Sequence, residues 1–478
     1  MNRREFVVST AAAAMLPRLS GWRGFLPPSR PVPSASQLAW QRDELALFHH
    51  FGVNTFTNRE WGDGTENPAV FNPTRFDARQ WARAARAAGA RTMILTAKHH
   101  DGFCLWPTST TRHSVASSPW RGGNGDVVRD FVDAARAEGL QAGLYLSPWD
   151  RNAPVYGDSP RYDDFYCAQL RELLTRYGTI AEVWFDGANG EGPNGRKQVY
   201  DWPRFWGLVR ELQPKAVMFS DAGPDVRWIG NETGLAAETN WSTVDPLVVR
   251  YPGASGDAVT SMLQHGDPNG LAWRPGETDV SIRPGWFYHA AEDARVRDVD
   301  NLVELFFTSV GRNSKLLLNV PPTPEGLLHD TDVKRLADMR TALYLAFERD
   351  LAQGATTAWR ATGRRAGVLE MDLGDLSEIA VVDLKEDIAR GQRVARYVLQ
   401  AERPGGGWMD ITDGTTIGYR KLERMTPTFT ARRLRVQVDT VDTPEAIGLA
   451  LYPPTPGSAS LDLSGQEPTP NFKRVRVA

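Results

Sequence analysis

The chain has 478 residues, more than a single hydrophobic core usually supports, so its length predicts at least two domains. Its hydrophobic content of 41% and charged content of 24% are typical of an ordinary soluble globular protein. The formal net charge of −3 gives no reason to expect nucleic acid or an anionic membrane surface as a partner.

The chain begins with MNRREFVVSTAAAAMLP, a short basic segment followed by a modest apolar stretch. Arg3 and Arg4, with the two residues after them, resemble a twin-arginine export signal; a basic start to a disordered tail is the alternative. We therefore expect residues 1–36 to be a signal peptide and linker, and the protein to be exported from a bacterium, either periplasmic or secreted. No segment reaches about 18 uncharged apolar residues, so no transmembrane helix is expected.

Between about residues 40 and 350, short apolar segments alternate with helical segments of ten or more residues. Strands are expected at 45–54, 92–102, 141–150, 180–187, 216–223 and 315–320. Helices are expected at 77–89, 126–139, 164–178, 202–214, 299–311 and 332–349. This alternation predicts an α/β fold with a parallel sheet. The length of the region favours a (β/α)8-type TIM barrel, regular or irregular, that spans residues 37–350. No GxGxxG motif follows the first strand, which weakens the alternative of an open dinucleotide-binding sheet.

After about residue 350 the pattern changes to short alternating strands separated by Gly, Pro and Asp. These strands are expected at 377–384, 395–402, 407–414 and 432–440. They predict a β-sandwich domain over residues 351–455, followed by a Pro- and Ser-rich tail, 456–478, that is expected to be poorly ordered. The sandwich either binds glycans or braces the barrel; the absence of a clear aromatic platform favours bracing.

Residues at the carboxyl ends of the barrel strands are the first candidates for chemistry, because TIM-barrel active sites lie on that face. The predicted strands end on His49 and His50, then His99, His100 and Asp101, then Tyr145 and Trp149, then Trp184 and Asp186, and then Asp221, which leads to Arg227, Trp228 and Glu232. These positions contain most of the functional groups that a small-molecule site needs.

The histidines are unusually paired. Eight histidines distributed at random over this length would give about 0.1 adjacent pairs, whereas this chain has two, His49-His50 and His99-His100. Neutral imidazoles both donate and accept, so such pairs suit the binding of sugar hydroxyls. Metal ligation and chance packing in the core are the alternatives.

Asp186 ends a buried strand in VWFDGANG, with Trp184 on the same side of that strand. It could be a nucleophile, a proton donor or acceptor, or a ligand; alternatively, its side chain only caps an Asx turn. Glycoside hydrolysis needs two carboxyl groups, and Glu232 lies in a loop that the barrel could bring opposite Asp186. The sequence alone does not select this pair over the other strand-end carboxylates, Asp101, Asp150 and Asp221.

Six ordered motifs carry a resemblance to a known family: HHFGVNTF, REWGDGTENP, LTAKHHDGFCLWPT, YLSPWDR, VWFDGANG and RWIGNETG. Over residues 40–325 the chain resembles glycoside hydrolase family 29, the α-L-fucosidases. The REWGDG and GNETG forms resemble its subfamily B, which is associated with α-1,3/1,4-linked fucose.

The resemblance implies a retaining, two-step hydrolysis. Asp186 would attack the anomeric carbon to form a covalent fucosyl-enzyme, and Glu232 would protonate the leaving sugar and then activate water. This requires an ionised Asp186 and a protonated Glu232. A retaining enzyme is expected to hold the two carboxyl groups about 5–5.5 Å apart.

The resemblance also implies a set of fucose-binding residues: His50, Glu60, Trp61, His99, His100, Tyr145, Trp184, Arg227 and Trp286. Glu66 is an alternative to Glu60, Phe287 would join Trp286 in an apolar wall for the C5 methyl group, and Arg227 could instead make a structural ion pair. The expected partners are fucosylated glycans such as Lewis-type oligosaccharides, with no metal or other cofactor, no nucleic acid and no membrane.

Two other functions remain open from the residues themselves. A metal-dependent hydrolase would use the histidine pairs and Asp101 as ligands. A non-catalytic barrel would bind fucose without turnover; the presence of both Asp186 and Glu232 argues against it.

Overall fold

A computed structural model of the protein describes residues 30–455. The predicted signal peptide lies almost entirely outside the described residues, and the predicted tail lies wholly outside them. Helix α1 (Ala35–Arg42) begins within the segment assigned to the linker, and Ser34 and Gln37 form a capping box at its start. In the part of the chain that the structure describes, no helix is both long enough and apolar enough to cross a membrane.

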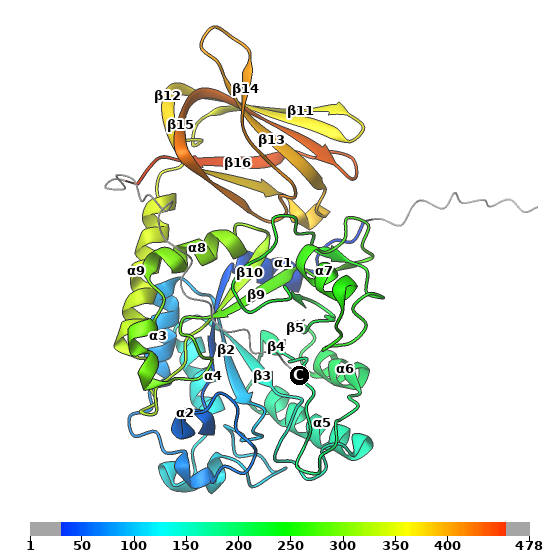
Figure 1. Cartoon of the computed structure of the whole chain (residues 1–478), viewed down its shortest axis with the longest axis vertical. Coiled ribbons are helices and arrows are strands. Elements are labelled where there is room, and N and C mark those ends of the chain that lie inside the picture. The colour runs from blue at the N-terminus through cyan, green and yellow to red at the C-terminus, as the bar shows by residue number, and fades with distance from the viewer. Residues whose placement is uncertain (1–29, 456–478) are drawn as a thin grey trace, which may run out of the picture. The chain divides into compact units, whose positions relative to one another are not determined.

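Eight parallel strands form a nearly closed barrel, which confirms the TIM-type α/β fold (Figure 1). They are β1 (Leu45–His49), β2 (Thr92–Lys98), β3 (Gln141–Leu146), β4 (Glu182–Trp184), β5 (Val217–Phe219), β6 (Arg227–Trp228), β9 (Gly276–Ser281) and β10 (Ser314–Asn319). The order around the barrel is β5-β4-β3-β2-β1-β10-β9-β6. A single parallel bridge, between Phe219 and Val226, spans the seam between β5 and β6.

Helices alternate with these strands along most of the chain and lie around them in Figure 1. They are α2 (Val53–Thr57), α3 (Ala78–Ala88), α4 (Val127–Ala137), α5 (Ser159–Arg176), α6 (Trp202–Leu212), α7 (Asp257–His265), α8 (Val299–Ser309) and α9 (Asp330–Phe347). Helix α3 illustrates their local signals: the Asp77 side chain accepts from the backbone N–H of Arg79 at 2.9 Å, and Gly89 ends the helix at a φ of 87°.

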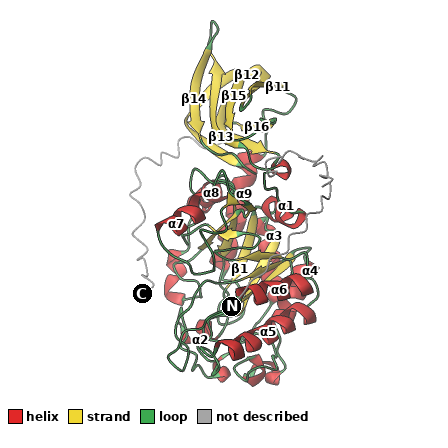
Figure 2. Cartoon of the chain, turned by 90° about the vertical axis from the view of Figure 1, so that its right-hand side faces the viewer, coloured by secondary structure: helices red, strands yellow, loops and turns green. Residues whose placement is uncertain are grey.

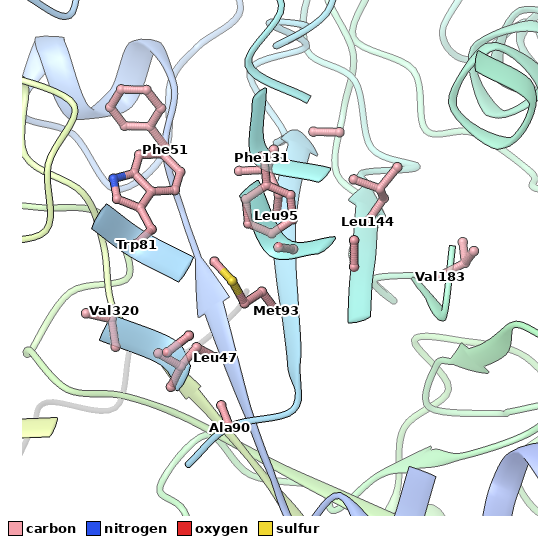
Figure 3. Close-up of a cluster of buried hydrophobic side chains, with 14 of the residues drawn as sticks. Leu47, Phe51, Trp81, Ala90, Met93, Leu95, Phe131, Leu144, Val183 and Val320 are labelled. Carbon is pink, nitrogen blue, oxygen red and sulfur yellow. The ribbon is translucent and has the colours of Figure 1, made fainter. Parts of the chain in front are cut away.

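The strands separate two apolar layers because successive side chains point to opposite faces. On the outer face, Leu47 and Met93 pack in one buried cluster with Trp81 of α3 and Phe131 of α4 (Figure 3). On the inner face, a second cluster fills the barrel with Ala46, Phe48, Ile94, Tyr145, Trp184, Val217, Phe219 and Leu317. The site residues therefore stand on a tightly packed scaffold.

The region from about residue 220 to residue 298 contains elements that the sequence pattern did not predict. The barrel strands β6 and β9 lie here, together with α7 and an antiparallel pair outside the barrel, β7 (Thr243–Val244) and β8 (Ala272–Trp273). Strand β6 is too short to show a pattern. Strand β9, GETDVS, is wholly buried but lacks an apolar run, because polar side chains occupy its inner face.

The C-terminal strands form one antiparallel sheet, as expected for the predicted β-sandwich class, and run side by side in Figure 2. They are β11 (Thr356–Gly363), β12 (Ala366–Glu386), β13 (Val394–Glu402), β14 (Trp408–Gly414), β15 (Lys421–Thr440) and β16 (Ile447–Tyr452). Register shifts interrupt the pairing of the long strands β12 and β15 between Asp372 and Ser377 and between Ile379 and Val381. Their apolar side chains enclose a core separate from those of the barrel.

Polar contacts join this sheet to the barrel. Arg420 pairs with Asp383 of its own domain at 2.9 Å and with Glu44, just before β1, at 3.0 Å. Gln392 accepts a hydrogen bond from the backbone of Ser242 at 2.7 Å and donates one to the carbonyl of Asn240 at 3.0 Å. These buried contacts support a bracing role for the C-terminal domain.

Candidate active site

Asp186 lies just beyond the carboxyl end of β4, with its side chain 26% exposed. Its Oδ1 atom accepts from the backbone N–H of Ala188 at 2.6 Å, which is the Asx turn that the sequence left open. Its Oδ2 atom accepts from the Tyr145 hydroxyl at 3.1 Å and lies 4.0 Å from Nε2 of His100. One oxygen therefore fixes the loop while the other faces the interior cluster of side chains.

Glu232 follows β6 in a loop and is exposed to solvent. Desolvation raises the pKa of Glu232, and the negative charges of Asp186 and, more weakly, of Glu60 raise it further. A hydrogen bond from the Trp286 side chain acts in the opposite direction. The structure therefore brings Glu232 within electrostatic reach of Asp186 and favours its protonated form.

The buried histidines His50, His99 and His100 form a neutral group at the ends of β1 and β2. Burial lowers the pKa of His50 to about 4, lowers that of His99 well below its ordinary value and also lowers that of His100. Nδ1 of His50 contacts Oδ1 of Asn319 at 2.8 Å, and Nδ1 of His100 contacts Oγ of Ser147 at 2.7 Å. Nδ1 of His99 is buried and has no hydrogen-bond partner among the described residues.

His49, the fourth histidine of the two pairs, lies on the other side of the strand. Its Nδ1 atom contacts the Val320 carbonyl at 2.8 Å, and its ring lies 5.4 Å from that of Trp81 in the helix layer. Strand alternation thus divides the first pair, and only His50 reaches the site. Within residues 30–455, no group of three or more His, Cys, Asp or Glu side chains is arranged to hold a metal ion.

Aromatic rings form two sides of the site. Trp61, 44% exposed, stands edge-on to His100 and to Trp149, each at 5.7 Å between ring centres. Across the cluster, the Trp286 ring lies 5.2 Å from His50, and the buried Phe287 ring lies 5.0 Å from His99. The predicted apolar wall is therefore beside the histidines.

Glu60 and Glu66, the two candidates from the REWGDGTENP segment, have different surroundings. Glu60 accepts from the backbone N–H of Trp286 at 2.8 Å and contacts Nε2 of His289 at 2.7 Å, and its side chain is 38% exposed. Glu66 is buried and accepts from the backbone of Asp63 at 2.7 Å within its own turn. The geometry places Glu60, and not Glu66, at the apolar wall.

Arg227 does not join this cluster. Its side chain is buried and donates to the carbonyl oxygens of Leu263, at 2.9 Å, and Arg274, and to Oδ1 of Asn240 at 2.7 Å. Trp228, the next residue along β6, points instead into the barrel. The structure therefore places Arg227 outside the cluster of site residues, where it holds neighbouring loops together and makes no ion pair within residues 30–455.

The three rival carboxylates have other partners. Asp101 accepts from the backbone of Phe103 at 2.7 Å, and Asp150 pairs with the buried Lys98 at 2.9 Å. Asp221 accepts from the backbone of Gly253 at 2.8 Å, and burial followed by the charge of Asp186 raises its pKa to about 6. Asp101 and Asp150 brace loops, and Asp221 ties a loop to the edge of the site.

Comparison with known proteins identifies the family. A family model described as Alpha-L-fucosidase matches residues 32–345 of this chain. The chain belongs to the α-L-fucosidase family of glycoside hydrolases. It is 43% identical over 453 residues to Alpha-L-fucosidase 1 from Arabidopsis thaliana, which covers 89% of this chain and 88% of the relative.

Two solved structures of related proteins extend the similarity to three dimensions. A putative alpha-L-fucosidase from Bacteroides ovatus is 46% identical with a TM-score of 0.79, covering 89% of this chain and 74% of that one. A Ruminococcus gnavus GH29 fucosidase in complex with fucose is 30% identical with a TM-score of 0.80, covering 90% of this chain and 96% of that one.

Sequence reasoning missed the inner face of β9 in this α-L-fucosidase. Glu277 accepts from Nε1 of Trp184 at 2.9 Å, Asp279 accepts from Nε1 of Trp228 at 2.8 Å, and Ser281 accepts from Nδ2 of Asn319 at 2.9 Å. Burial, followed by the charge of Glu232, raises the pKa of Asp279 well above its ordinary value. The sequence did contain a signal for this face, because Glu277, Asp279 and Ser281 occupy alternate positions and would point to the same side of a strand.

Proposed function

We propose that the protein is a retaining, exo-acting α-L-fucosidase that hydrolyses terminal α-1,3/1,4-linked L-fucose from oligosaccharides or glycoconjugates. The observation that carries this proposal is the contrast between its two carboxyl groups. Asp186 accepts hydrogen bonds from Tyr145 and Ala188, whereas desolvation and the charge of Asp186 raise the pKa of Glu232. A retaining glycosidase uses one carboxylate and one carboxylic acid in this way.

In the first step, a carboxylate oxygen of Asp186 attacks the anomeric carbon while Glu232 gives its proton to the departing glycosidic oxygen. The glycosidic C–O bond breaks, and fucose stays bound to Asp186 as an ester. In the second step, Glu232, now a carboxylate, takes a proton from water, whose oxygen attacks the anomeric carbon and releases Asp186. Glu232 ends the cycle protonated, so no cofactor is needed.

The neutral histidines are suited to fucose, because an uncharged imidazole both donates to and accepts from sugar hydroxyls. Nδ1 of His99, which lacks a partner in the described chain, is the clearest free group. Trp286 and Phe287 supply an apolar surface for the C5 methyl group. The fucose bound in the Ruminococcus gnavus relative supports this class of ligand.

Assignment to subfamily B, and therefore to α-1,3/1,4 linkages and Lewis-type glycans, rests on the REWGDG and GNETG forms. Both segments carry site residues, since the first contains Glu60 and Trp61 and the second contains Glu232. The exposed Trp61 can contact the sugar that departs, as aromatic faces stack on pyranose rings.

We also propose that the enzyme is exported through the twin-arginine route to the periplasm or the medium, where it meets glycans. This proposal rests on Arg3 and Arg4 in the N-terminal sequence. Cell fractionation of the protein with and without Arg3→Lys and Arg4→Lys together tests it. Equal export of both forms would contradict a twin-arginine signal.

The central experiment measures release of free fucose from a Lewis-type trisaccharide and from an aryl α-fucoside. Proton NMR at early times then identifies the anomer of the product. We expect efficient release from the branched glycan, slow release from the aryl fucoside and α-fucose as the first product. Release of β-fucose would exclude retention, preference for the aryl fucoside would exclude the subfamily assignment, and no release would exclude the proposed activity.

A further inference from the structure

Two glutamates and a lysine are buried together inside the barrel, below the site. Glu182 of β4, Glu277 of β9 and Lys315 of β10 are each at most 1% exposed. An unpaired charge is energetically costly in a buried site, so the charges of these three side chains must be balanced by pairing or by protonation. The established reaction requires no acid at this depth, and the cluster therefore needs its own explanation.

Most atoms of the cluster have clear partners. Oε2 of Glu182 accepts from Nε1 of Trp40, in α1, at 3.0 Å and lies 3.5 Å from Nζ of Lys315. Oε1 of Glu277 accepts from Nε1 of Trp184 at 2.9 Å. Lys315 supplies one positive charge, which balances one carboxylate and not two.

The remaining two oxygens are the informative ones. Oε1 of Glu182 and Oε2 of Glu277 are both buried, and neither receives a hydrogen bond from an N–H or hydroxyl donor in the described chain. The two side chains are nevertheless close enough to hydrogen-bond to each other. Two carboxylates cannot do so unless one of them carries a proton. Burial and then the charge of Glu182 raise the pKa of Glu277 well above its ordinary value, which identifies the protonated member.

We propose that Glu277 is a neutral carboxylic acid that donates its proton to Glu182 and, in that form, positions Trp184 beside Asp186. The lone charge of Glu182 is then balanced by Lys315, and every polar atom of the cluster has a partner. Glu277 is a positioning residue, since it acts through Trp184. The inference deepens the proposed function, because it takes Trp184 to be part of the fucose site.

The geometry around Trp184 shows how Glu277 can affect binding. The indole is 7% exposed, stacks on Phe219 at 4.1 Å and 6° between planes, and stands edge-on to Tyr145 at 5.1 Å. Tyr145 in turn donates to Asp186. Without a hydrogen-bond acceptor at position 277, the Trp184 N–H would be buried and unpaired. The indole could avoid that energetic cost only by rotating away from its present position.

Three variants of the full chain test the proposal. In Glu277→Gln, the amide carbonyl can accept from Trp184 and the amide N–H can donate to Glu182, so we expect fucose affinity and kcat/KM within about threefold of wild type. Glu277→Leu lacks both groups, and we expect fucose affinity to fall about tenfold in folded protein, through KM more than kcat. Glu182→Gln removes the carboxylate that contacts both Trp40 and Lys315 and should lower the melting temperature by several degrees more than Glu277→Gln does.

Difference infrared spectroscopy at neutral pH provides a readout that is independent of fucosidase activity. Wild type minus Glu277→Gln should show the loss of one protonated-carboxyl C=O band. The absence of that band would contradict the proposal that Glu277 is protonated. A Glu277→Gln protein that fails to fold, or that loses fucose affinity as Glu277→Leu does, would also contradict it. Unchanged fucose affinity in folded Glu277→Leu would overturn the positioning role. Wild-type protein that releases no fucose contradicts the proposed function, while the infrared band still decides the protonation of Glu277.

Discussion

The half of the barrel that carries Asp186 differs from the half that carries Glu232 in both regularity and charge. Strands β1 to β4 are linked by parallel ladders of three or more residue pairs, with one register shift between β2 and β3, and their ends present hydrogen-bond donors and neutral rings around Asp186. The half around β6 and β9 has short or polar strands and long loops, and Asp279 of β9 lies near Glu232, as does Glu60, which reaches this half from the connection between β1 and β2. The comparison gives a physical basis for the proposed division of roles: hydrogen-bond donors surround Asp186, whereas desolvation and nearby negative charge raise the pKa of Glu232.

The largest effect is expected from Asp186→Asn, because it removes the proposed nucleophile from the donor-rich half while keeping the shape of the side chain. We expect kcat/KM for every fucoside to fall by about 10⁴-fold or more. Mass spectrometry of quenched reactions should show no fucosyl adduct on this variant. Substantial remaining activity would transfer the nucleophilic role to another carboxylate, with Asp221 the first to examine.

Glu232→Gln tests the acidic half and should depend on the leaving group. For a Lewis-type glycan, whose leaving sugar needs a proton, we expect a loss of about 10²–10⁴-fold in kcat/KM. An aryl fucoside with an acidic phenol should lose much less in the first step, so fucosyl-enzyme should accumulate and be visible by mass spectrometry. An equal loss for both substrates would contradict the role of Glu232 as the general acid.

Glu60→Gln removes one negative charge from the acidic half and should move the pH profile. In the proposed mechanism Glu232 is the protonated acid, so activity is expected to fall as the pH rises through its pKa. Because the charge of Glu60 raises that pKa, its removal should shift the alkaline limb of kcat/KM to lower pH. We also expect KM to rise by about tenfold as the wall formed by Trp286 loosens.

Glu66→Gln is the matched control for this shift. Glu66 bonds within its own turn, so the alkaline limb should stay in place even if the protein becomes less stable. An alkaline limb that moves with Glu66→Gln but not with Glu60→Gln would reverse the assignment of the two glutamates.

The smallest effect on catalysis is expected from Arg227→Met. Its lost hydrogen bonds leave buried carbonyl groups unpaired, so the free energy of unfolding should fall by about 1–3 kcal/mol. KM of the folded variant should remain within about twofold of wild type, because the side chain points away from the site. A large rise in KM in folded protein would restore Arg227 to the binding residues.

Much of the regular half could be predicted from the sequence, because its strands carry apolar runs and its helices carry capping signals. The limits appear at particular residues. His49 and His50 are equivalent in the sequence, yet strand alternation sends them to opposite faces. Arg227 and Trp228 are separated in the same way, and the sequence offered no means to establish which of them faces inward.

The irregular half could not be predicted by periodicity, since β9 has a polar inner face and the hydrophobic pattern of a strand is absent there. Glu277 and Asp279 are buried, and Trp184 and Trp228, distant from them in the sequence, supply hydrogen-bond donors for them. Such residues become recognisable once the barrel brings β4 and β6 near β9. Motif resemblance found Glu232 in this half, where composition alone could not select it.

The single bridge between Phe219 and Val226 has a consequence for how the enzyme fails under heat. Every other neighbouring pair of barrel strands shares a ladder of two or more residue pairs, so the seam between β5 and β6 is where the barrel opens most readily. Glu232 follows β6 closely, while Asp186 follows β4 inside the ladder. We therefore expect partial opening to displace the proposed proton donor first, so that a warmed enzyme loses its activity on poor leaving groups before it unfolds.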